Sequence, residues 1–298
     1  RFDGRIRRVR NAQREDGNMV ADRDELVEVT LKCPAKVNLF LQVGRKREDG
    51  YHGILTIFQT IDLYDELILR PGVSTSFFKS DTGLAWNSSN TLYKAFKAVE
   101  KHLGKELALE MELKKKIPTG GGLGGGSSDA AALLRYLGET FHIEREAIFE
   151  IACSIGSDVP FFLRGGTAIG TGRGEVLTFP GDLKGYSVDL CFPGIEVSTP
   201  LAYALLGRSS DRQELSNKEV EKLLSAFRER DLVLIGKLSK NDFEEPVFAK
   251  FPVIERAYNK LREKRKAIVT RMTGSGSTLF SLFEGMDGEY NFVTSTDG

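Results

Sequence analysis

The feature that most constrains this 298-residue chain is a glycine-rich segment at residues 117–137, IPTGGGLGGGSSDAAALLRYL, between a predicted strand and a predicted helix. Glycine reaches positive φ at low cost and lets other atoms approach the backbone. Serine is a preferred N-cap, so we expect Ser127 and Ser128 to begin the helix. Free N–H groups at a helix start, together with the helix dipole, favour anions. The segment therefore predicts a phosphate-binding loop.

Other interpretations of these glycines are weaker. A flexible Gly/Ser linker is disfavoured because strand residues precede the loop and helix formers follow it without a spacer. An ordinary P-loop is excluded because no Lys-Ser/Thr pair follows the glycines. A dinucleotide fingerprint fits poorly, since the run is denser in glycine than G-x-G-x-x-G and no acidic residue clearly closes a second strand about 20 residues on.

Length and charge narrow the class of protein. A chain of 298 residues is near the upper limit for one core, so we expect two packed domains. Lys+Arg and Asp+Glu both number 42, and a zero formal net charge favours neither nucleic acid nor an anionic membrane. The cysteines are few and widely spaced (Cys33, Cys153 and Cys191), which predicts buried thiols in a reducing compartment. We therefore expect a soluble, cytoplasmic protein.

Hydrophobic patterning predicts the elements. Strands are expected at residues 26–32, 36–43, 54–62, 66–70, 107–113 and 186–192, and at both ends of residues 267–283. Helices are expected at residues 91–102, 144–155, 217–230, 232–240 and 253–264, and after Ser198-Thr199-Pro200. Pro160 disfavours a helical conformation for Val159, so Asp158 is expected on a turn that enters a short buried strand.

We divide the chain into an arm and two domains. Residues 1–18 carry six arginines and almost no apolar residues, which indicates a disordered arm or a non-native extension. Residues 19–183 would form the N-terminal domain with the phosphate-binding loop, and residues 184–298 the C-terminal domain. The arm contains acidic residues and no serine, unlike a transit peptide.

Residues outside the loop are weak candidates when taken singly. Lys36 and Asn38 lie two apart on a predicted strand and so face the same side, but a strand lysine is more often solvated. Asp158 is more often a turn former and His52 more often a loop histidine. Only their combination points to a function.

In combination, five motifs resemble those of the GHMP small-molecule kinases. They are PAKVN at residues 34–38, GYH at 50–52, the glycine loop, GSDVP at 156–160 and TGSG at 273–276. The resemblance covers residues 30 to about 283. It implies an α+β, two-domain GHMP kinase fold: a ribosomal-protein-S5-like N-terminal domain plus an α/β-sandwich C-terminal domain, with the active site in the cleft between them.

The segments PAKVN, DGYH and SDVPFF resemble one branch of the family. Its members use ATP to phosphorylate the 2-hydroxyl of a cytidine diphosphate-linked methylerythritol, in the non-mevalonate route to isoprenoid precursors. The resemblance implies ATP and Mg²⁺ as cofactors and this small molecule as the substrate. We expect no nucleic-acid or membrane partner, and a monomer or weak homodimer.

The resemblance also assigns roles to residues. Lys36 and Asp158 resemble the catalytic pair: Asp158 would accept or orient the substrate hydroxyl proton, and Lys36 would hold Asp158 ionised and offset charge on the transferring phosphoryl group. The implied ATP site comprises Pro118, Gly120, Gly121, Gly122, Leu123, Gly124, Gly125, Gly126, Ser127, Ser128, Asn90 and Lys115. No metal ligand is certain, although Ser127 or Ser128 would be candidates to contact Mg²⁺.

At the substrate end, the resemblance implies Asn38, Tyr51, His52, Asp158, Thr199 and Tyr203. Tyr51 and Tyr203 would stack on the two faces of the cytosine, His52 would bond its edge, and Asn38 would hold erythritol hydroxyls. A closing motif would come from the second domain as Thr273, Gly274, Ser275 and Gly276. Ordinary explanations remain for three of these features: core packing for Tyr203, a glycine hairpin for TGSG and a solvated face for Lys114 to Lys116.

Some features depart from the family pattern, and three rival functions stay open. Asp129 stands where some relatives have Asn, and the chain ends soon after residue 283, which leaves closure of the second sheet open. One rival is a GHMP kinase for mevalonate, homoserine or a sugar, which DGYH and Tyr203 disfavour. A catalytically silent member is disfavoured by Lys36 and Asp158, and a nucleic-acid role for the arm by the zero net charge.

Overall fold

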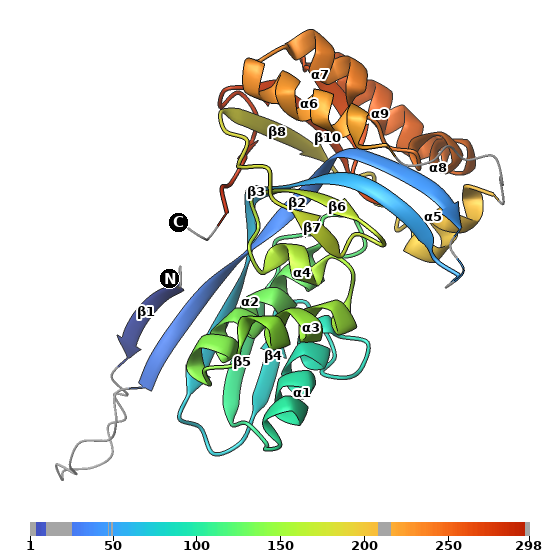
Figure 1. Ribbon diagram of the computed structural model, residues 1–298. Coiled ribbons are helices and arrows are strands. Elements are labelled where there is room, and N and C mark those ends of the chain that lie inside the picture. Colours follow the sequence, from blue (N-terminus) through green and yellow to red (C-terminus); the bar gives the residue numbers. More distant parts are fainter. Residues whose placement is uncertain (1–3, 10–25, 47, 49, 208–215, 296–298) are drawn as a thin grey trace.

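The structure is a computed structural model that describes all residues except 1–3, 10–25, 47, 49, 208–215 and 296–298 (Figure 1). Two sheets form its framework: a seven-stranded sheet with the order β1-β2-β3-β5-β4 and with β6 and β7 branching from β3, and a four-stranded sheet with the order β11-β8-β10-β9. Figure 1 shows β2 and β3 running from the half that holds α1 to α4 into the half that holds α6, α7 and α9. This is the predicted two-domain α+β arrangement.

The first sheet is built on a hairpin of two long antiparallel strands, β2 (Leu26–Lys46) and β3 (His52–Pro71). We predicted each of them as two separate strands, which was wrong. The pairing continues because register shifts between Pro34 and Ala35 and between Asn38 and Phe40 absorb the irregular residues. The remaining strands are β1 (Gly4–Val9), β4 (Phe77–Ser80), β5 (Leu109–Lys114), β6 (Thr167–Thr171) and β7 (Val176–Thr178).

The predicted arm also differs from expectation at residues 4–9, which form β1 antiparallel to β2 instead of a disordered segment. The edge of a sheet offers unpaired N–H and C=O groups that an extended segment can satisfy. The other arm residues, 1–3 and 10–18, lie outside the described part of the chain.

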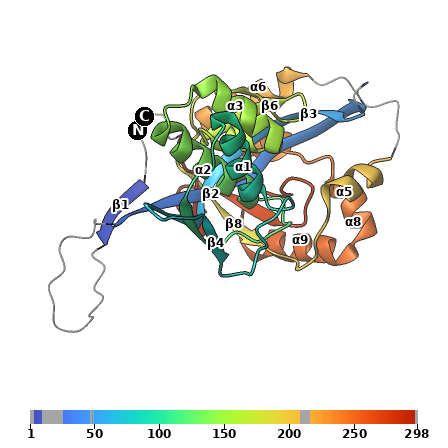
Figure 2. The same ribbon diagram turned by 90° about the horizontal axis from the view of Figure 1, so that it is seen from below.

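Four helices cover the first sheet: α1 (Thr91–Leu103), α2 (Gly125–Thr140), α3 (Arg145–Ile155) and α4 (Val159–Phe162). The predicted helix at residues 91–102 is confirmed as α1: the Asn90 side chain caps its start, and Gly104 ends it with φ of 64°. The apolar faces of these helices share a core with β2, β3 and β5 that includes Phe96, Met111 and Leu133. Figure 2 shows α1, α2 and α3 grouped over one part of the fold and α5, α8 and α9 over another.

The second half contains β8 (Tyr186–Cys191), β9 (Val269–Met272), β10 (Leu279–Glu284) and β11 (Tyr290–Asn291). Its helices are α5 (Thr199–Leu205), α6 (Asn217–Glu229), α7 (Leu232–Leu238), α8 (Glu244–Lys250) and α9 (Pro252–Lys264). The predicted start of α5 is confirmed, since the Ser198 hydroxyl accepts a hydrogen bond from the N–H of Leu201. We did not predict α8, because its pattern is short and only Val247 in it is buried.

Apolar contacts between the two halves fix their relative position and therefore the shape of the cleft between them. Val37 and Phe40 of β2 lie in one hydrophobic cluster with Phe227 of α6 and Phe280 of β10. The tail also joins the halves, because β11 pairs with β8 and Phe292 forms a bridge with Ile61. Within the described residues, the helices are too short or too polar to span a bilayer.

Candidate active site

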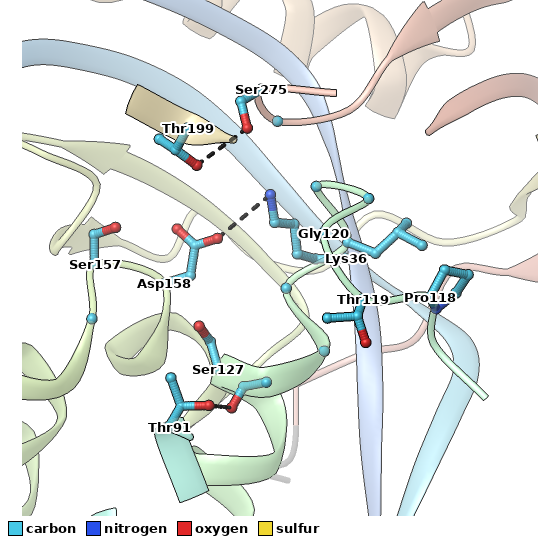
Figure 3. Close-up of a pocket in the computed structure, with 18 of the residues that line it drawn as sticks. Lys36, Thr91, Pro118, Thr119, Gly120, Ser127, Ser157, Asp158, Thr199 and Ser275 are labelled. Atoms are coloured by element: carbon cyan, nitrogen blue, oxygen red, sulfur yellow. Dashed lines mark hydrogen bonds and ion pairs between the residues drawn. The ribbon is translucent and has the colours of Figure 1, made fainter. Parts of the chain in front are cut away.

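The main cleft of the molecule has a volume of about 640 Å³ and is lined by both halves. The first half supplies Lys36, the glycine loop and Asp158, and the second half supplies Thr199 and Ser275 (Figure 3). Other predicted residues that line the cleft are Asn38, Asn90, Lys115, Pro118, Tyr203 and Gly274. Those that do not line it are Tyr51, His52, Ser128, Thr273 and Gly276.

The glycine loop leads into α2, which begins at Gly125 and has Gly124 at its N-cap. We predicted a serine cap, and this was wrong: Ser127 and Ser128 lie inside the first turn, and no side chain caps the helix. Glycine can occupy an N-cap position without a capping side chain, because its backbone adopts conformations that are costly for other residues. The first N–H groups of α2 therefore have no side-chain acceptor and are free for a ligand.

The loop has a defined shape that needs glycine. Gly120, Gly122 and Gly124 alternate along it with φ of 72°, 79° and 74°, values that other residues rarely adopt. A Cβ atom on Gly122 would overlap the carbonyl oxygen of Thr273. On Gly124, a Cβ atom would lie 2.7 Å from the ring of Phe162. These close approaches argue against a flexible linker.

The two loop serines differ in environment. Ser127 lines the cleft, and Figure 3 shows its side chain on the side of Asp158. Ser128 is buried and instead lines a smaller cavity of about 100 Å³ beside Lys32 and Arg135. Ser127 is therefore the serine placed to meet a ligand in the main cleft.

Lys36 and Asp158 form an ion pair in the cleft, with Nζ of Lys36 3.5 Å from Oδ2 of Asp158 (Figure 3). Asp158 directly precedes α4, whereas we predicted a short strand there. The helix forms because Pro160 lies in its first turn, where the missing N–H has no intrahelical partner. Asp158 is partly exposed to the cleft, whereas Lys36 is buried.

The surroundings of Lys36 fix both its backbone and its charge. Its N–H donates to the carbonyl of Leu123, which ties β2 to the glycine loop at 2.9 Å. Its ammonium donates to Oδ1 of Asn38 at 2.7 Å. Burial lowers the pKa of Lys36, and the neighbouring Asp158 carboxylate opposes that shift. The Asn38 contact is the shorter of the two contacts of the ammonium.

Lys115 does not project freely into the cleft. Its ammonium lies between the buried carboxylates of Asp65 and Asp129, and its distance to Asp129 is 2.9 Å. Asp65 also accepts the N–H groups of Lys116 at 2.6 Å and Ile117 at 2.8 Å, at the entry to the loop. We did not predict Asp65, although an acidic residue within an apolar strand is a detectable signal. Burial raises the pKa of Asp129 to about 7, opposed by Lys115.

Two of the three residues predicted for the cytosine, Tyr51 and His52, lie at the tip of the long hairpin, and the third, Tyr203, lies in α5. Tyr51 is 57% exposed, and the guanidinium of Arg173 lies 5.0 Å from its ring centroid. His52 stacks on Tyr203, which lines the cleft. Arg173 and Glu196 also line the cleft and were missed, because nothing in the sequence distinguishes them from other hairpin and loop charges.

The predicted closing motif is the turn between β9 and β10. Gly274 and Ser275 line the cleft, and the Ser275 hydroxyl lies 3.3 Å from that of Thr199. Asn90, predicted for the ATP site, caps α1 through its side chain and also donates to the carbonyl of Ala85.

The residues present fit a magnesium ion that arrives with a nucleotide. Among the described residues, no cluster of three or more His, Cys, Asp or Glu side chains could hold a metal by itself. Mg²⁺ usually keeps several waters and takes one or two protein oxygens together with substrate phosphates. The Ser127 hydroxyl, which lines the cleft, is an oxygen donor of that kind.

Comparison with family models identifies two matching regions. Residues 90–166 match "GHMP kinases N terminal domain", and residues 223–289 match "GHMP kinases C terminal". The first region contains the glycine loop and Asp158, and the second contains the TGSG turn.

Curated relatives match most of the chain. A 4-diphosphocytidyl-2-C-methyl-D-erythritol kinase of Thermotoga maritima is 45% identical over 259 residues, which are 87% of this chain and 93% of the relative. The enzyme of the same name from Pseudothermotoga lettingae is 42% identical, with the same two coverages.

Solved structures agree in fold. A crystal structure of 4-(cytidine 5'-diphospho)-2C-methyl-D-erythritol kinase superposes with a TM-score of 0.73 at 35% identity, covering 86% of this chain and 90% of that one. A homoserine kinase from Cytophaga hutchinsonii has a TM-score of 0.64 at 21% identity, covering 90% and 88%. The second likeness concerns the fold alone.

Proposed function

The chain belongs to the 4-diphosphocytidyl-2-C-methyl-D-erythritol kinases of the GHMP kinase family, and from this premise we propose how its cleft performs the reaction. It uses ATP to phosphorylate 4-diphosphocytidyl-2-C-methyl-D-erythritol, a step of the non-mevalonate route to isoprenoid precursors. The acceptor in our proposal is the 2-hydroxyl of the methylerythritol unit.

One observation carries the mechanism: the ion pair of Lys36 and Asp158 lines the same cleft as the glycine loop. Asp158 orients the acceptor hydroxyl and takes its proton as the phosphoryl group transfers. Lys36 pairs with the Asp158 carboxylate and offsets charge on the phosphoryl oxygens. Since the transition state of such transfers is usually loose, positioning and charge stabilisation contribute more than the strength of the base.

The ATP phosphates bind along the glycine loop at the start of α2, where the N–H groups lack a side-chain cap. Ser127 lines this part of the cleft and would hold Mg²⁺ or a phosphate oxygen. When bound, Mg²⁺ would neutralise charge on the phosphates. Asn90 and Lys115 line the same cleft and border the adenine.

The substrate binds at the opposite end, towards the hairpin tip. Tyr203 and Thr199 line the cleft, whereas Tyr51 and His52 contact the cleft residues Arg173 and Tyr203. In our proposal Tyr51 and Tyr203 take the faces of the cytosine and His52 its edge, and Thr199 lies between base and acceptor. Asn38 donates one Nδ2 hydrogen to Thr56 at 2.8 Å, which leaves its other Nδ2 hydrogen for an erythritol hydroxyl. Gly274 and Ser275 close the cleft from the second half.

The test is an acceptor panel. The purified protein is incubated with ATP, Mg²⁺ and one acceptor at a time: the diphosphocytidyl substrate, mevalonate or homoserine, and ADP release is followed. We expect turnover only with the diphosphocytidyl substrate, and ³¹P and ¹³C NMR of the product should place the new phosphate on the 2-hydroxyl. Faster turnover of mevalonate or homoserine would replace the proposed substrate. No turnover with any acceptor would favour a catalytically silent member.

We place this activity in the cytoplasm, in a monomer or weak homodimer that needs no nucleic-acid or membrane partner. The three cysteines are unpaired, which agrees with a reducing compartment, although Cys153 and Cys191 are half-buried and not buried as predicted. Light scattering across a concentration series tests the oligomeric state.

A further inference from the structure

The side-chain amide of Asn38 lies where three parts of the molecule meet. Asn38 belongs to β2, is 2% exposed, and accepts the Lys36 ammonium at Oδ1. The same oxygen accepts the N–H of Gly274 at 2.9 Å and the hydroxyl of Thr273 at 3.1 Å. Both of these donors come from the β9–β10 turn of the second half. One oxygen atom therefore links the closing turn to the lysine of the catalytic pair.

The orientation of this amide is fixed from both ends. At the other end Nδ2 donates to the Thr56 hydroxyl at 2.8 Å. That hydroxyl donates its own hydrogen to the carbonyl of Phe40 at 2.7 Å, so it can only accept from Asn38. A flipped amide would present Nδ2 to the ammonium and to the Gly274 N–H, neither of which can accept, so both hydrogen bonds would be lost.

Thr273 reaches this junction without contacting the cleft. It is fully buried and absent from the lining of the main cleft. Its hydroxyl donates to Oδ1 of Asn38 and accepts the backbone N–H of Asn38, each at 3.1 Å. The hydroxyl also lies 3.5 Å from the carbonyl oxygen of Gly122, so Asn38 is its nearer partner, and a role for this side chain in the reaction would pass chiefly through Asn38.

The turn that carries Thr273 is itself rigidly held. The side-chain amide of Asn241 donates to the carbonyls of Met272 at 2.6 Å and Gly274 at 2.9 Å. A Cβ atom on Gly274 would lie 3.1 Å from the carbonyl oxygen of Gly122 and 3.5 Å from the Lys36 ammonium. The turn thus packs directly against both the glycine loop and the lysine.

Given the proposed catalytic role of Lys36, we propose that Thr273 is a positioning residue that acts through Asn38 to hold the Lys36 ammonium beside Asp158. A lysine ammonium is a compact charge on a flexible stem, so its position depends on its acceptors. Asp158 lies 3.5 Å from Nζ and Asn38 only 2.7 Å, so the amide is the closer constraint. The second half of the chain then controls the catalytic pair and not only the closure of the cleft.

Thr273→Val tests this role because it removes the hydroxyl and nearly conserves shape. We expect kcat to fall by about ten- to a hundredfold, the range for one lost hydrogen bond to a charged network, with both KM values within about twofold of wild type. Thr273→Ser restores the hydroxyl and should recover most of the loss. The matched control is Thr270→Val, since Thr270 is a buried β9 residue whose hydroxyl pairs with that of Ser281 at 2.8 Å and does not reach Asn38.

The pH profile separates positioning from general destabilisation. An acceptor stabilises the charged ammonium, so loss of the ordered Asn38 contact should lower the pKa of Lys36 further. The alkaline limb of kcat should therefore move to lower pH in Thr273→Val and stay in place in Thr270→Val. An unchanged kcat and alkaline limb in folded Thr273→Val would overturn the proposal, as would an equal loss in Thr270→Val.

Two further measurements test the positioning role in cases that the Thr273→Val kinetics alone would not resolve. If thermal melting shows Thr273→Val to be unfolded, Asn38→Ala removes the same acceptor from the other side, and an alkaline limb that stays in place there also overturns the proposal. Wild-type protein that fails to phosphorylate the diphosphocytidyl substrate counts against the proposed function. Active wild-type protein with an unimpaired Thr273→Val variant counts against the positioning role alone.

Discussion

The imidazole of His52 stacks on the phenol ring of Tyr203, with ring centroids 5.3 Å apart and an interplanar angle of 20°. His52 begins β3 and Tyr203 lies in α5, so the stack joins the tip of the long hairpin to the second half. Tyr203 also makes an edge contact with Phe243 at 5.0 Å, which holds its ring. These rings form an aromatic cluster at the end of the molecule where we propose that the cytosine binds.

The first prediction concerns Tyr51, an exposed residue that directly precedes His52 in the chain. Base stacking on an aromatic side chain contributes about 1–3 kcal/mol. We expect Tyr51→Ala to weaken binding of the diphosphocytidyl substrate by about ten- to a hundredfold and to leave ATP binding nearly unchanged. Isothermal calorimetry with each ligand measures both effects, and Tyr51→Phe should behave like wild type. Unchanged affinity for the substrate in Tyr51→Ala would refute the stacking role.

The second prediction concerns the shape of the glycine loop. Gly122 has positive φ, and a Cβ atom there would overlap the carbonyl oxygen of Thr273. We expect Gly122→Ala to raise the KM for ATP by at least about tenfold. The added Cβ atom would displace the loop, and the N–H groups of the displaced loop would lose more than one hydrogen bond to the ATP phosphates. Gly285→Ala is the control, since Gly285 also has positive φ but nothing lies within 4 Å of the added atom. Equal ATP kinetics in both variants would contradict the prediction.

The third prediction concerns stability. The Lys115 ammonium pairs with the buried carboxylate of Asp65 and also contacts the buried Asp129, and removing one partner of a buried ionic group costs about 3–5 kcal/mol. We expect Lys115→Met to lower the free energy of unfolding in urea by about that amount. Lys116→Met should cost less than about 1 kcal/mol, because the pair of Lys116 with Glu66 is exposed. A similar small loss in both variants would show that the buried cluster is not a stabilising ionic unit.

The fourth prediction concerns pH. The pKa of Asp129 is raised by burial from 3.8 to about 7. Between these values the folded protein keeps a proton that the unfolded chain releases, so this group makes stability fall as pH rises, by at most about 1.4 kcal/mol per unit. Asp129→Asn removes this dependence. The wild-type advantage over the variant in urea unfolding should therefore shrink from pH 4 to pH 7, and a growing advantage would contradict the raised pKa.

Much of the fold followed from local chemistry. Asn90, Gly104 and Ser198 are caps whose effect needs no tertiary context, and the corresponding helix ends were predicted. The start of α2 was not, because Ser127 looks like a cap but the left-handed Gly124 provides the turn one helical turn earlier. Pro160 likewise has two effects: it disfavours a helical conformation of the residue before it, but it is accepted in the first turn of a helix, where it lies in α4.

The candidate site also combines features that could be predicted from the sequence with features that could not. Lys36 and Asp158 were predicted from their motifs, and the structure brings them together in one cleft. The burial of Lys115 by Asp65 was not predicted, because residues 50 apart in sequence meet only through the β3–β5 pairing. The engagement of Asn38 by Thr273 depends on a contact between the two halves that no local pattern encodes.

The central claim is that Asp158 and Lys36 act together on the acceptor hydroxyl. Its most direct test is the single-turnover rate of phosphoryl transfer from ATP to the diphosphocytidyl substrate in wild type, Asp158→Asn and Lys36→Met. We predict that each variant binds both substrates but transfers the phosphoryl group roughly two to three orders of magnitude more slowly, the loss expected for one preorganised charge-stabilising group. A transfer rate near that of wild type in either variant would remove that residue from the mechanism.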